Sequence, residues 1–258
     1  MTLNDILTAA QANETGLALA IPPTWMQGRT AYGGLTAAIA LDAALRSEDD
    51  LPPLRSAQIA FVGPVAGEVT VETRLLRRGR TAAFIEASVY CDGKLGTRGL
   101  FVFMTNLKSG IDMVDTLPAT SIALDEAIPV RPHPDPSFFT NNFEFRYAAP
   151  KQDEPAPEFL RWAKLGDRTG LHPAVELMAI GDAMPPAAMM LAKEFGPISS
   201  MTWMVNVLSD APASADGWWL TRSVADYARN GSSNQTMQVW NSSGDLILSG
   251  MQSVAIFV

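Results

Sequence analysis

The pattern of apolar and polar residues changes its period in each half of the chain. In the helix predicted at 34–46, only Thr36 and Asp42 interrupt the apolar run from Leu35 to Leu45, which is typical of a helix buried nearly all round. Gly33 and Gly34 form a turn directly before it. After this helix the pattern alternates, most strictly in 68–75, as in half-buried strands. One buried helix followed by a run of strands predicts a sheet curled around that helix.

The strands of the first half are predicted at 17–21, 56–62, 68–75, 81–90 and 95–104. Asp92-Gly93 is a strong hairpin signal between the last two of them. Long strands joined by tight turns are paired in antiparallel fashion, so an antiparallel sheet is expected.

The second half repeats this order of elements. Pro173 can open a helix, which continues to Asp182 and is stopped by Pro185-Pro186. Strands are predicted at 142–147, 159–164, 199–208, 217–227, 232–241 and 246–258. When the halves are superimposed, 41–43 falls on 181–183, 56–62 on 200–206, and Gly99 on Gly250. We therefore expect a duplicated unit of fold class α+β, with two long helices, each wrapped by a curled antiparallel sheet, and the two sheets joined edge to edge.

This repeat divides the chain into an N-terminal unit at 1–107, a linker at 108–140 and a C-terminal unit at 141–258. The linker contains several prolines and no sustained periodicity, and it is expected to lie against the surface.

Composition narrows the possible functions. The chain of 258 residues has a net charge of -8, which argues against a nucleic-acid surface because phosphate binding requires clusters of Lys and Arg. One such cluster, at positions 74, 77, 78 and 80, is interpreted as the solvated rim of a hairpin, with an anionic ligand as the alternative. Cys91 is the only cysteine, so no disulfide within the chain and no cysteine-rich zinc site is possible.

The N-terminal residues do not predict a signal peptide, and no apolar run approaches the ~20 residues that span a membrane. We therefore expect a cytoplasmic location and no membrane partner.

The order of these elements resembles that of the double-hotdog acyl-CoA thioesterases, the group of bacterial acyl-CoA thioesterase II. The resemblance covers nearly the whole chain. It depends on Tyr32-Gly33-Gly34 before an alanine-rich helix, on Ile180-Gly181-Asp182, on Gly244-Asp245-Leu246, and on Ser249-Gly250-Met251-Gln252. It implies a tandem (double) hotdog fold.

The resemblance also implies a catalytic set. In this family an aspartate on the second helix, a Ser or Thr on the next strand and a glutamine on the last strand hold the attacking water. Asp182 and Gln252 match the aspartate and the glutamine. The family's threonine falls on Ile198, which has no hydroxyl, so Ser200 is the preferred hydroxyl, with Ser199 and Thr202 as alternatives.

These residue types suit thioester hydrolysis. A carboxylate accepts the proton of water, and a glutamine and a hydroxyl orient that water. Backbone N–H groups near Gly33 and Gly34, at a helix N-terminus, can hold a developing oxyanion, and Tyr32 joins them as a substrate-binding candidate. Purely structural roles remain open: a tight turn for the glycines, a solvent-facing helix end for Asp182, and a polar edge position for Gln252.

The repeat is not symmetric at these positions. Asp42 matches Asp182, but Phe101 matches Gln252, and Leu41 takes the place of an acid that single-hotdog thioesterases carry. We therefore expect Asp42 to be structural and the second half to be catalytic.

The leading function is hydrolysis of acyl-CoA thioesters to free acid and CoA, without a metal or an organic cofactor. Two alternatives remain: a non-catalytic acyl-CoA or acyl-lipid binding protein, and a hydratase or dehydratase of the same fold. The latter enzymes use an active-site histidine, and neither His133 nor His172 is well placed for that role. Acyl-CoA is the expected partner, and a homodimer or higher homo-oligomer the expected assembly.

Overall fold

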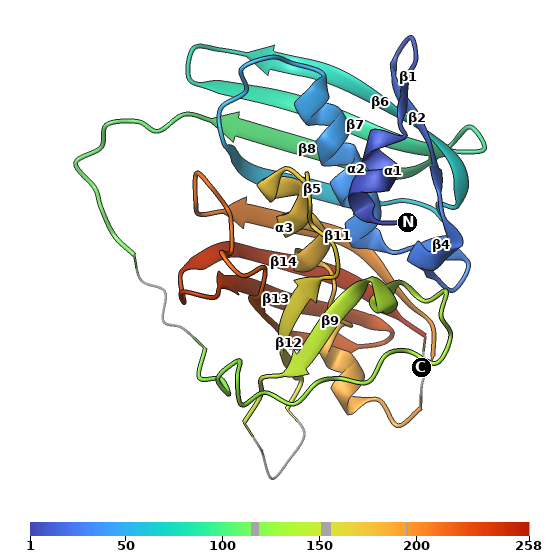
Figure 1. Cartoon of the computed structure of the whole chain (residues 1–258), viewed down its shortest axis with the longest axis vertical. Helices are drawn as coiled ribbons and strands as arrows, with labels where there is room; N and C mark the ends of the chain where they lie inside the picture. Colours follow the sequence, from blue (N-terminus) through green and yellow to red (C-terminus); the bar gives the residue numbers. More distant parts are fainter. Residues whose placement is uncertain (115–118, 151–155, 195, 258) are drawn as a thin grey trace.

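The computed structural model describes residues 1–114, 119–150, 156–194 and 196–257. A single antiparallel sheet of twelve strands runs through both halves, in the order β1-β2-β6-β7-β8-β5-β11-β14-β13-β12-β10-β9. Both main helices lie on one face of this sheet, which curls around them (Figure 1). The sheet is open, with β1 and β9 at its edges.

The strands of the N-terminal half are β1 (Gln11–Ala12), β2 (Gly16–Ile21), β5 (Leu54–Phe61), β6 (Gly67–Arg78), β7 (Ala82–Cys91) and β8 (Lys94–Met104), and β3 (Met26–Gln27) and β4 (Thr30–Ala31) form a separate small hairpin. The helices here are α1 (Leu3–Thr8), the 3-10 helix η1 (Pro23–Trp25) and α2 (Gly33–Arg46).

The strands of the C-terminal half are β9 (Phe143–Tyr147), β10 (Glu158–Leu165), β11 (Ile198–Val207), β12 (Trp219–Arg229), β13 (Ser232–Asn241) and β14 (Leu246–Ile256). Its helices are η2 (Phe139–Asn142), α3 (Pro173–Gly181) and η3 (Ala187–Leu191). All the long strands predicted from the alternating pattern are present, with ends that differ by a few residues.

The two halves meet along β5 and β11, which pair with Thr202 opposite Ala60 and Asn206 opposite Ser56. This seam produces the edge-to-edge joining of the two sheets that the repeat predicts. It also brings α2 and α3 into contact on the same face of the sheet.

The expectation of two long helices is not confirmed. Helix α2 has 14 residues, but α3 has nine and ends at Gly181. Asp182 caps it, and its φ of -102° and ψ of 9° lie outside the helical range. Pro185 and Pro186 follow shortly afterwards and prevent the helix from resuming, because proline lacks the N–H that the helix requires.

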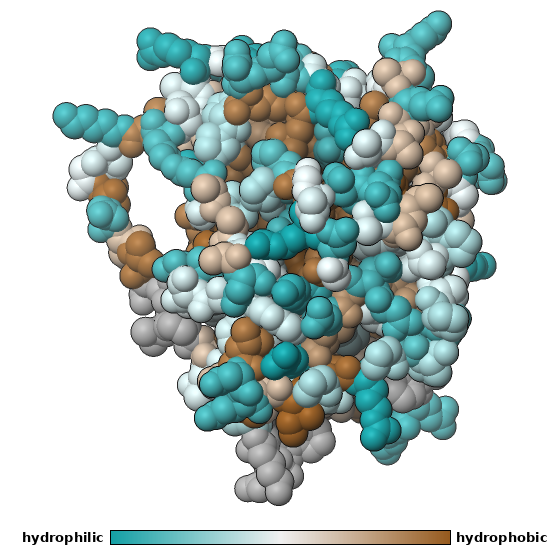
Figure 2. Space-filling view, in the orientation of Figure 1, coloured by the Kyte–Doolittle hydropathy of each residue, from teal (hydrophilic) through white to brown (hydrophobic). Residues whose placement is uncertain are grey.

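The segment between the halves lies only partly against the surface. Ile111, Met113 and Val114 are each about 80% exposed, at 84%, 79% and 82%, so this part of the prediction is wrong. In Figure 2 the chain around them arches away from the body of the molecule. Further along, Ala127 is buried and Ile122 packs on a cluster of tryptophan and leucine side chains of the C-terminal sheet.

Tyr32 joins the two halves in the core. Its hydroxyl donates a hydrogen bond to the backbone carbonyl of Ala179 in α3, and its ring stacks on Phe139 with the centroids 4.3 Å apart. The residue is 1% exposed. Tyr32 therefore ties the start of α2 to the last turn of α3.

We predict that Tyr32→Phe lowers the free energy of unfolding by about 1–3 kcal/mol, because it leaves the buried Ala179 carbonyl without its partner. Urea denaturation measures this. Tyr227→Phe, on a half-exposed tyrosine of β12, is the matched control and is expected to stay within about 0.5 kcal/mol of the unmodified protein. Equal effects of the two substitutions would contradict the prediction.

Candidate active site

Asp182 lies where the two halves meet. It caps the C-terminal end of α3, and its carboxylate accepts a hydrogen bond of 2.7 Å at Oδ1 from Nε2 of Gln252 in β14. Its other oxygen, Oδ2, faces the start of α2, because a Cβ built on Gly33 would approach it to 2.6 Å. The carboxylate is thus enclosed by residues from both halves.

Burial raises the pKa of Asp182 to about 7, because removal from water disfavours the charged form of the carboxyl group. The hydrogen bond from Gln252 and the backbone N–H of Gly34 act in the opposite direction, since both stabilise the carboxylate. A carboxyl group with a pKa near neutrality can exchange a proton with water at physiological pH, as general acid–base chemistry requires.

Gly33 and Gly34 each leave space that a side chain would fill. A Cβ at Gly33 would meet Asp182 and the ring of Phe61, and one at Gly34 would meet the ring of Tyr32. The absence of side chains thus lets the N-terminus of α2 approach the carboxylate closely. Tyr32 itself is a buried core residue, and the charge of Asp182 adds to the effect of burial in raising its pKa well above the usual range.

Of the three candidate hydroxyls, Ser200 lies on the same face of β11 as Gln252 does on β14. A register shift between Ser200 and Thr202 places Ser200 opposite Val254, while Thr202 lies opposite Ser253. Cross-strand partners share a face, and Val254 and Gln252 both point into the core. Ser199 and Thr202 therefore point to the outer face. Within the described residues, no hydrogen bond joins the Ser200 hydroxyl to Asp182 or Gln252.

Sequence reasoning missed one member of this cluster, Gln235 of β13. It is fully buried, and its Nε2 donates a hydrogen bond of 2.8 Å to Oε1 of Gln252. The signal was present in the alternating pattern of this strand, because Gln235 is in phase with the buried Met237 and Val239. A glutamine on the core side of a strand requires buried polar partners.

The corresponding positions of the N-terminal half are different. Asp42 lies within α2, and its Oδ2 is 2.8 Å from Nε of Arg46 one turn later. Burial raises its pKa, and Arg46 opposes that rise. Phe101 is fully buried in the core. The polar cluster of Asp182 therefore has no equivalent at these two positions.

The two histidines lie away from Asp182. His172 caps the N-terminus of α3, where its ring accepts a hydrogen bond from the N–H of Ala174. Asp182 lies ten residues further along, which corresponds to roughly 15 Å of helical rise. His133 stacks on Phe138 in the segment between the halves.

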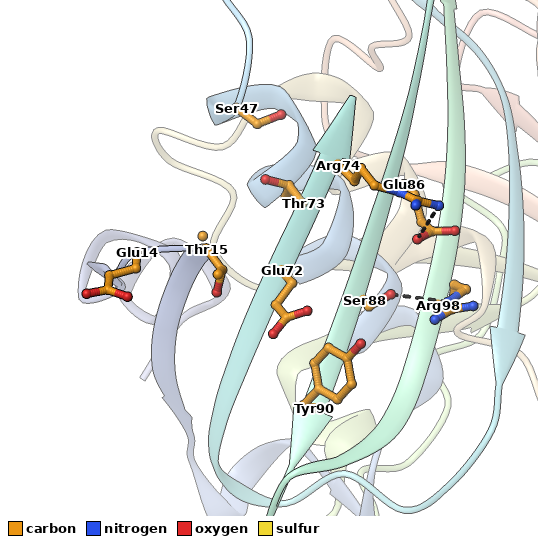
Figure 3. Close-up of a pocket in the computed structure, with 11 residues that line it drawn as sticks. Glu14, Thr15, Ser47, Glu72, Thr73, Arg74, Glu86, Ser88, Tyr90 and Arg98 are labelled. Carbon is orange, nitrogen blue, oxygen red and sulfur yellow. Dashed lines mark hydrogen bonds and ion pairs between the residues drawn. The ribbon is translucent and has the colours of Figure 1, made fainter. Parts of the chain in front are cut away.

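A hollow of about 760 Å³ lies beside β6, β7 and β8 of the N-terminal sheet and reaches Ser47 at the C-terminal end of α2. Figure 3 shows its polar lining, in which Arg74 pairs with Glu86 and Arg98 donates to Ser88. It contains none of the predicted site residues, and these arginines already have partners within the protein.

Among the described residues, no group of three His, Cys, Asp or Glu side chains could hold a metal ion. Nor is any helix in the described parts of the chain long and apolar enough to cross a membrane.

Solved structures share this architecture. A protein of unknown function with a hot dog fold from Alicyclobacillus acidocaldarius superimposes with a TM-score of 0.86 at 20% identity, covering 100% of this chain and 99% of its own. A protein of Thermobifida fusca YX assigned as a thioesterase II superimposes with a TM-score of 0.85 at 19% identity, covering 100% of this chain and 98% of its own. The acyl-CoA thioesterase II TesB2 of Mycobacterium marinum superimposes with a TM-score of 0.70 at 16% identity, covering 98% of this chain and 97% of its own. No curated protein matches the chain in sequence.

These similarities, with the continuous sheet and the helices on one face, define a double-hotdog protein. Sequence models of two family domains match as well: the acyl-CoA thioesterase N-terminal domain over residues 21–104, and the C-terminal domain over residues 122–256. The chain belongs to the acyl-CoA thioesterase family, whose members are hydrolases that act on thioesters.

The raised pKa of Asp182 predicts a pH-dependent stability. The folded protein keeps this proton up to about pH 7, whereas the unfolded chain releases it near pH 3.8, so the stabilising contribution is complete at low pH and is lost as pH rises through 7. We predict that Asp182→Asn gains stability relative to the unmodified protein as pH rises from 5 to 8. Thermal denaturation at several pH values measures the difference. The control is Asp92→Asn, at an exposed hairpin turn, for which a constant difference is expected.

Proposed function

We propose that this thioesterase hydrolyses its acyl-CoA substrate with a single water molecule activated by Asp182. The observation that carries this proposal is the enclosed carboxylate of Asp182, which is held at Oδ1 by Gln252 and has a pKa of about 7. Its other oxygen, Oδ2, faces the glycines at the start of α2. A base with this pKa is ionised in a large fraction of molecules at neutral pH and still able to accept a proton.

The steps follow from this geometry. Asp182 takes one proton from water, and the resulting hydroxide attacks the carbonyl carbon of the thioester. The carbonyl oxygen becomes an oxyanion in the tetrahedral intermediate. When the intermediate collapses, the carbon–sulfur bond breaks and the thiolate of CoA leaves, taking up the proton that Asp182 holds. The products are the free acid and CoA, and the carboxylate is regenerated.

The N-terminus of α2 is the proposed site for the oxyanion. The first N–H groups of a helix have no carbonyl partner within it, and the helix dipole adds positive potential there. Gly33 and Gly34 occupy these positions next to Asp182. Because the N–H of Gly34 already donates to the carboxylate of Asp182, the N–H of Gly33 is the proposed donor to the oxyanion. One half of the chain would thus stabilise the oxyanion while the other supplies the base. Phe61 contacts the same glycine and borders the site.

Ser200 is the proposed hydroxyl that orients the water. The bulge in β11 supports this choice, because it places Ser200 on the face of the sheet that carries Gln252. Gln252 retains one N–H of its amide beyond the one given to Asp182, so it can also donate to the water.

A non-catalytic acyl-CoA binding protein is the alternative, since no hydrogen bond joins Ser200 to Asp182 among the described residues. A hydratase is less well supported, because His172 lies at the opposite end of α3 from Asp182. A panel of acyl-CoA substrates with a free-thiol readout separates these functions. Thiol release supports the thioesterase, whereas saturable binding without release from any chain length would favour the binding protein. The homo-oligomer, the cytoplasmic location and the domain limits stay predictions.

For the base we predict that kcat/KM rises with pH through about 7, as the Asp182 carboxyl ionises. Asp182→Asn is expected to lower kcat by about 10²–10⁴-fold because the amide cannot accept the proton. Asp42→Asn, at the matching position of the first half, is the control and should remain active. A folded but inactive Asp42→Asn protein, beside an active Asp182→Asn protein, would place the base in the other half.

For the hydroxyl we predict that Ser200→Ala lowers kcat by about tenfold to a hundredfold, the effect of losing one hydrogen bond to the reacting water. Ser199→Ala and Thr202→Val remove hydroxyls on the outer face of the same strand, and each is expected to leave kcat unchanged. A larger loss for either outer variant than for Ser200→Ala would overturn the assignment.

A further inference from the structure

A continuous chain of buried hydrogen bonds leads from the backbone of η3 to Asp182. The N–H of Ala187 donates to Oε1 of Gln235 at 2.8 Å, and Nε2 of Gln235 donates to Oε1 of Gln252 at 2.8 Å. Nε2 of Gln252 then donates to Oδ1 of Asp182 at 2.7 Å. Gln235 is 0% exposed and Gln252 is 2% exposed, so both amides are shielded from bulk water.

The direction of this chain is set at its backbone end. A peptide N–H can donate but cannot accept, so the group of Gln235 that faces Ala187 must be its oxygen. The amide nitrogen of Gln235 therefore faces Gln252, which must present its own oxygen in return. This leaves the nitrogen of Gln252 toward Asp182. One backbone N–H thus determines the orientation of two side-chain amides.

We propose that Gln235 is a positioning residue: by fixing the orientation of Gln252, it keeps an N–H donor on Oδ1 of Asp182 and leaves Oδ2, beside Gly33, as the oxygen that accepts the proton of water. The assignment of Oδ2 rests on the proposed role of Asp182 as the base. The positioning itself concerns only the hydrogen bonds of this cluster and can be tested without turnover.

Loss of Gln235 has a specific electrostatic consequence. Without it, Gln252 can rotate its amide by half a turn and present Oε1 to Asp182. Two acceptors then face each other, and that contact is favourable only when the carboxyl group carries a proton. The hydrogen bond that stabilises the ionised form is lost, so the pKa of Asp182 must rise further.

The surroundings of Asp182 allow this change to be measured. Tyr32, at the start of α2, is the ionisable side chain coupled to it, and its pKa lies well above the usual range, so it stays neutral near pH 7. On α3 itself Glu176 lies almost two turns away, and it accepts a hydrogen bond from Nε1 of Trp219. From β5, β13 and β14 the groups that lie toward the cluster are uncharged: Phe61, Gln235 and Gln252.

The test compares Gln235→Met with Gln238→Met. Both replace a glutamine of β13 by an apolar side chain of similar length, but Gln238 points to the opposite face, where it accepts a hydrogen bond from Arg222. The carboxyl carbon of Asp182, labelled with ¹³C and assigned through Asp182→Asn, is titrated by NMR in each protein. We expect its pKa to rise by about one pH unit or more in Gln235→Met, a typical effect of losing one stabilising hydrogen bond, and to stay unchanged in Gln238→Met.

Kinetics give a second, independent measurement. The substrate is the acyl-CoA that the unmodified enzyme hydrolyses best. Gln235→Met should shift the acidic limb of the kcat/KM profile to higher pH by as much as the pKa of Asp182 rises. It should also lower kcat and leave KM unchanged. Gln238→Met is expected to keep the profile of the unmodified enzyme. If Gln235 only stabilised the fold, the denaturation temperature would fall and the acidic limb would stay in place.

Gln235→Glu covers the case in which the methionine variant does not fold. While protonated, the introduced carboxyl group can both accept from Ala187 and donate to Gln252, so activity is retained in that state. Once it ionises it can no longer donate, so we expect a bell-shaped pH profile in place of a single acidic limb. A single limb at the position of the unmodified enzyme would overturn the proposal.

The outcomes separate the two proposals. An unchanged titration of Asp182 in Gln235→Met overturns the positioning role even if the enzyme is an active thioesterase. If the unmodified protein releases no thiol but the titration moves as expected, the positioning holds and the hydrolytic mechanism fails.

Discussion

The structure depends on how one carboxylate is buried between two halves of a chain. Asp182 ends a helix of the second half and faces the glycines that start the helix of the first. A buried carboxylate is costly unless its oxygens have partners. Here Gln252 donates a hydrogen bond to Oδ1, the backbone N–H of Gly34 also donates to the carboxylate, and Gly33 lies close to Oδ2. The contact between Asp182 and the start of α2 therefore needs both features. The seam between β5 and β11 brings the two halves together, and the glycines allow the close approach.

Much of the fold could be predicted from the sequence, because its signals are local. The apolar run before Arg46 and the alternation around Val71 report directly on burial, and tight turns such as Asp92-Gly93 define neighbouring strands. The internal repeat added the long-range information. Matching β5 with β11 indicated two equivalent edges, and these edges pair in the structure.

The details of the site depended on information that the sequence does not carry locally. The sequence favoured Ser200 as the hydroxyl but left Ser199 and Thr202 as alternatives, because a bulge after Ser200, which turns Thr202 outward, cannot be read from the alternating pattern. The role of Tyr32 in the core depends on Ala179, far along the chain. The alternating pattern of β13 marks Gln235 as a polar residue at a buried position. Its hydrogen bond with Gln252 could not be predicted, because that bond depends on how β13 and β14 are aligned. Pairings between distant elements set each of these features.

The asymmetry between the halves has an evolutionary consequence. Where the second half has Gln252, the first has Phe101, which is fully buried. A symmetric pair of single units would need every substitution to satisfy two roles at once, since both copies come from one coding sequence. After duplication the copies diverge separately. In this chain the first half has apolar packing at the position of Gln252, while its glycines meet the acid of the second half.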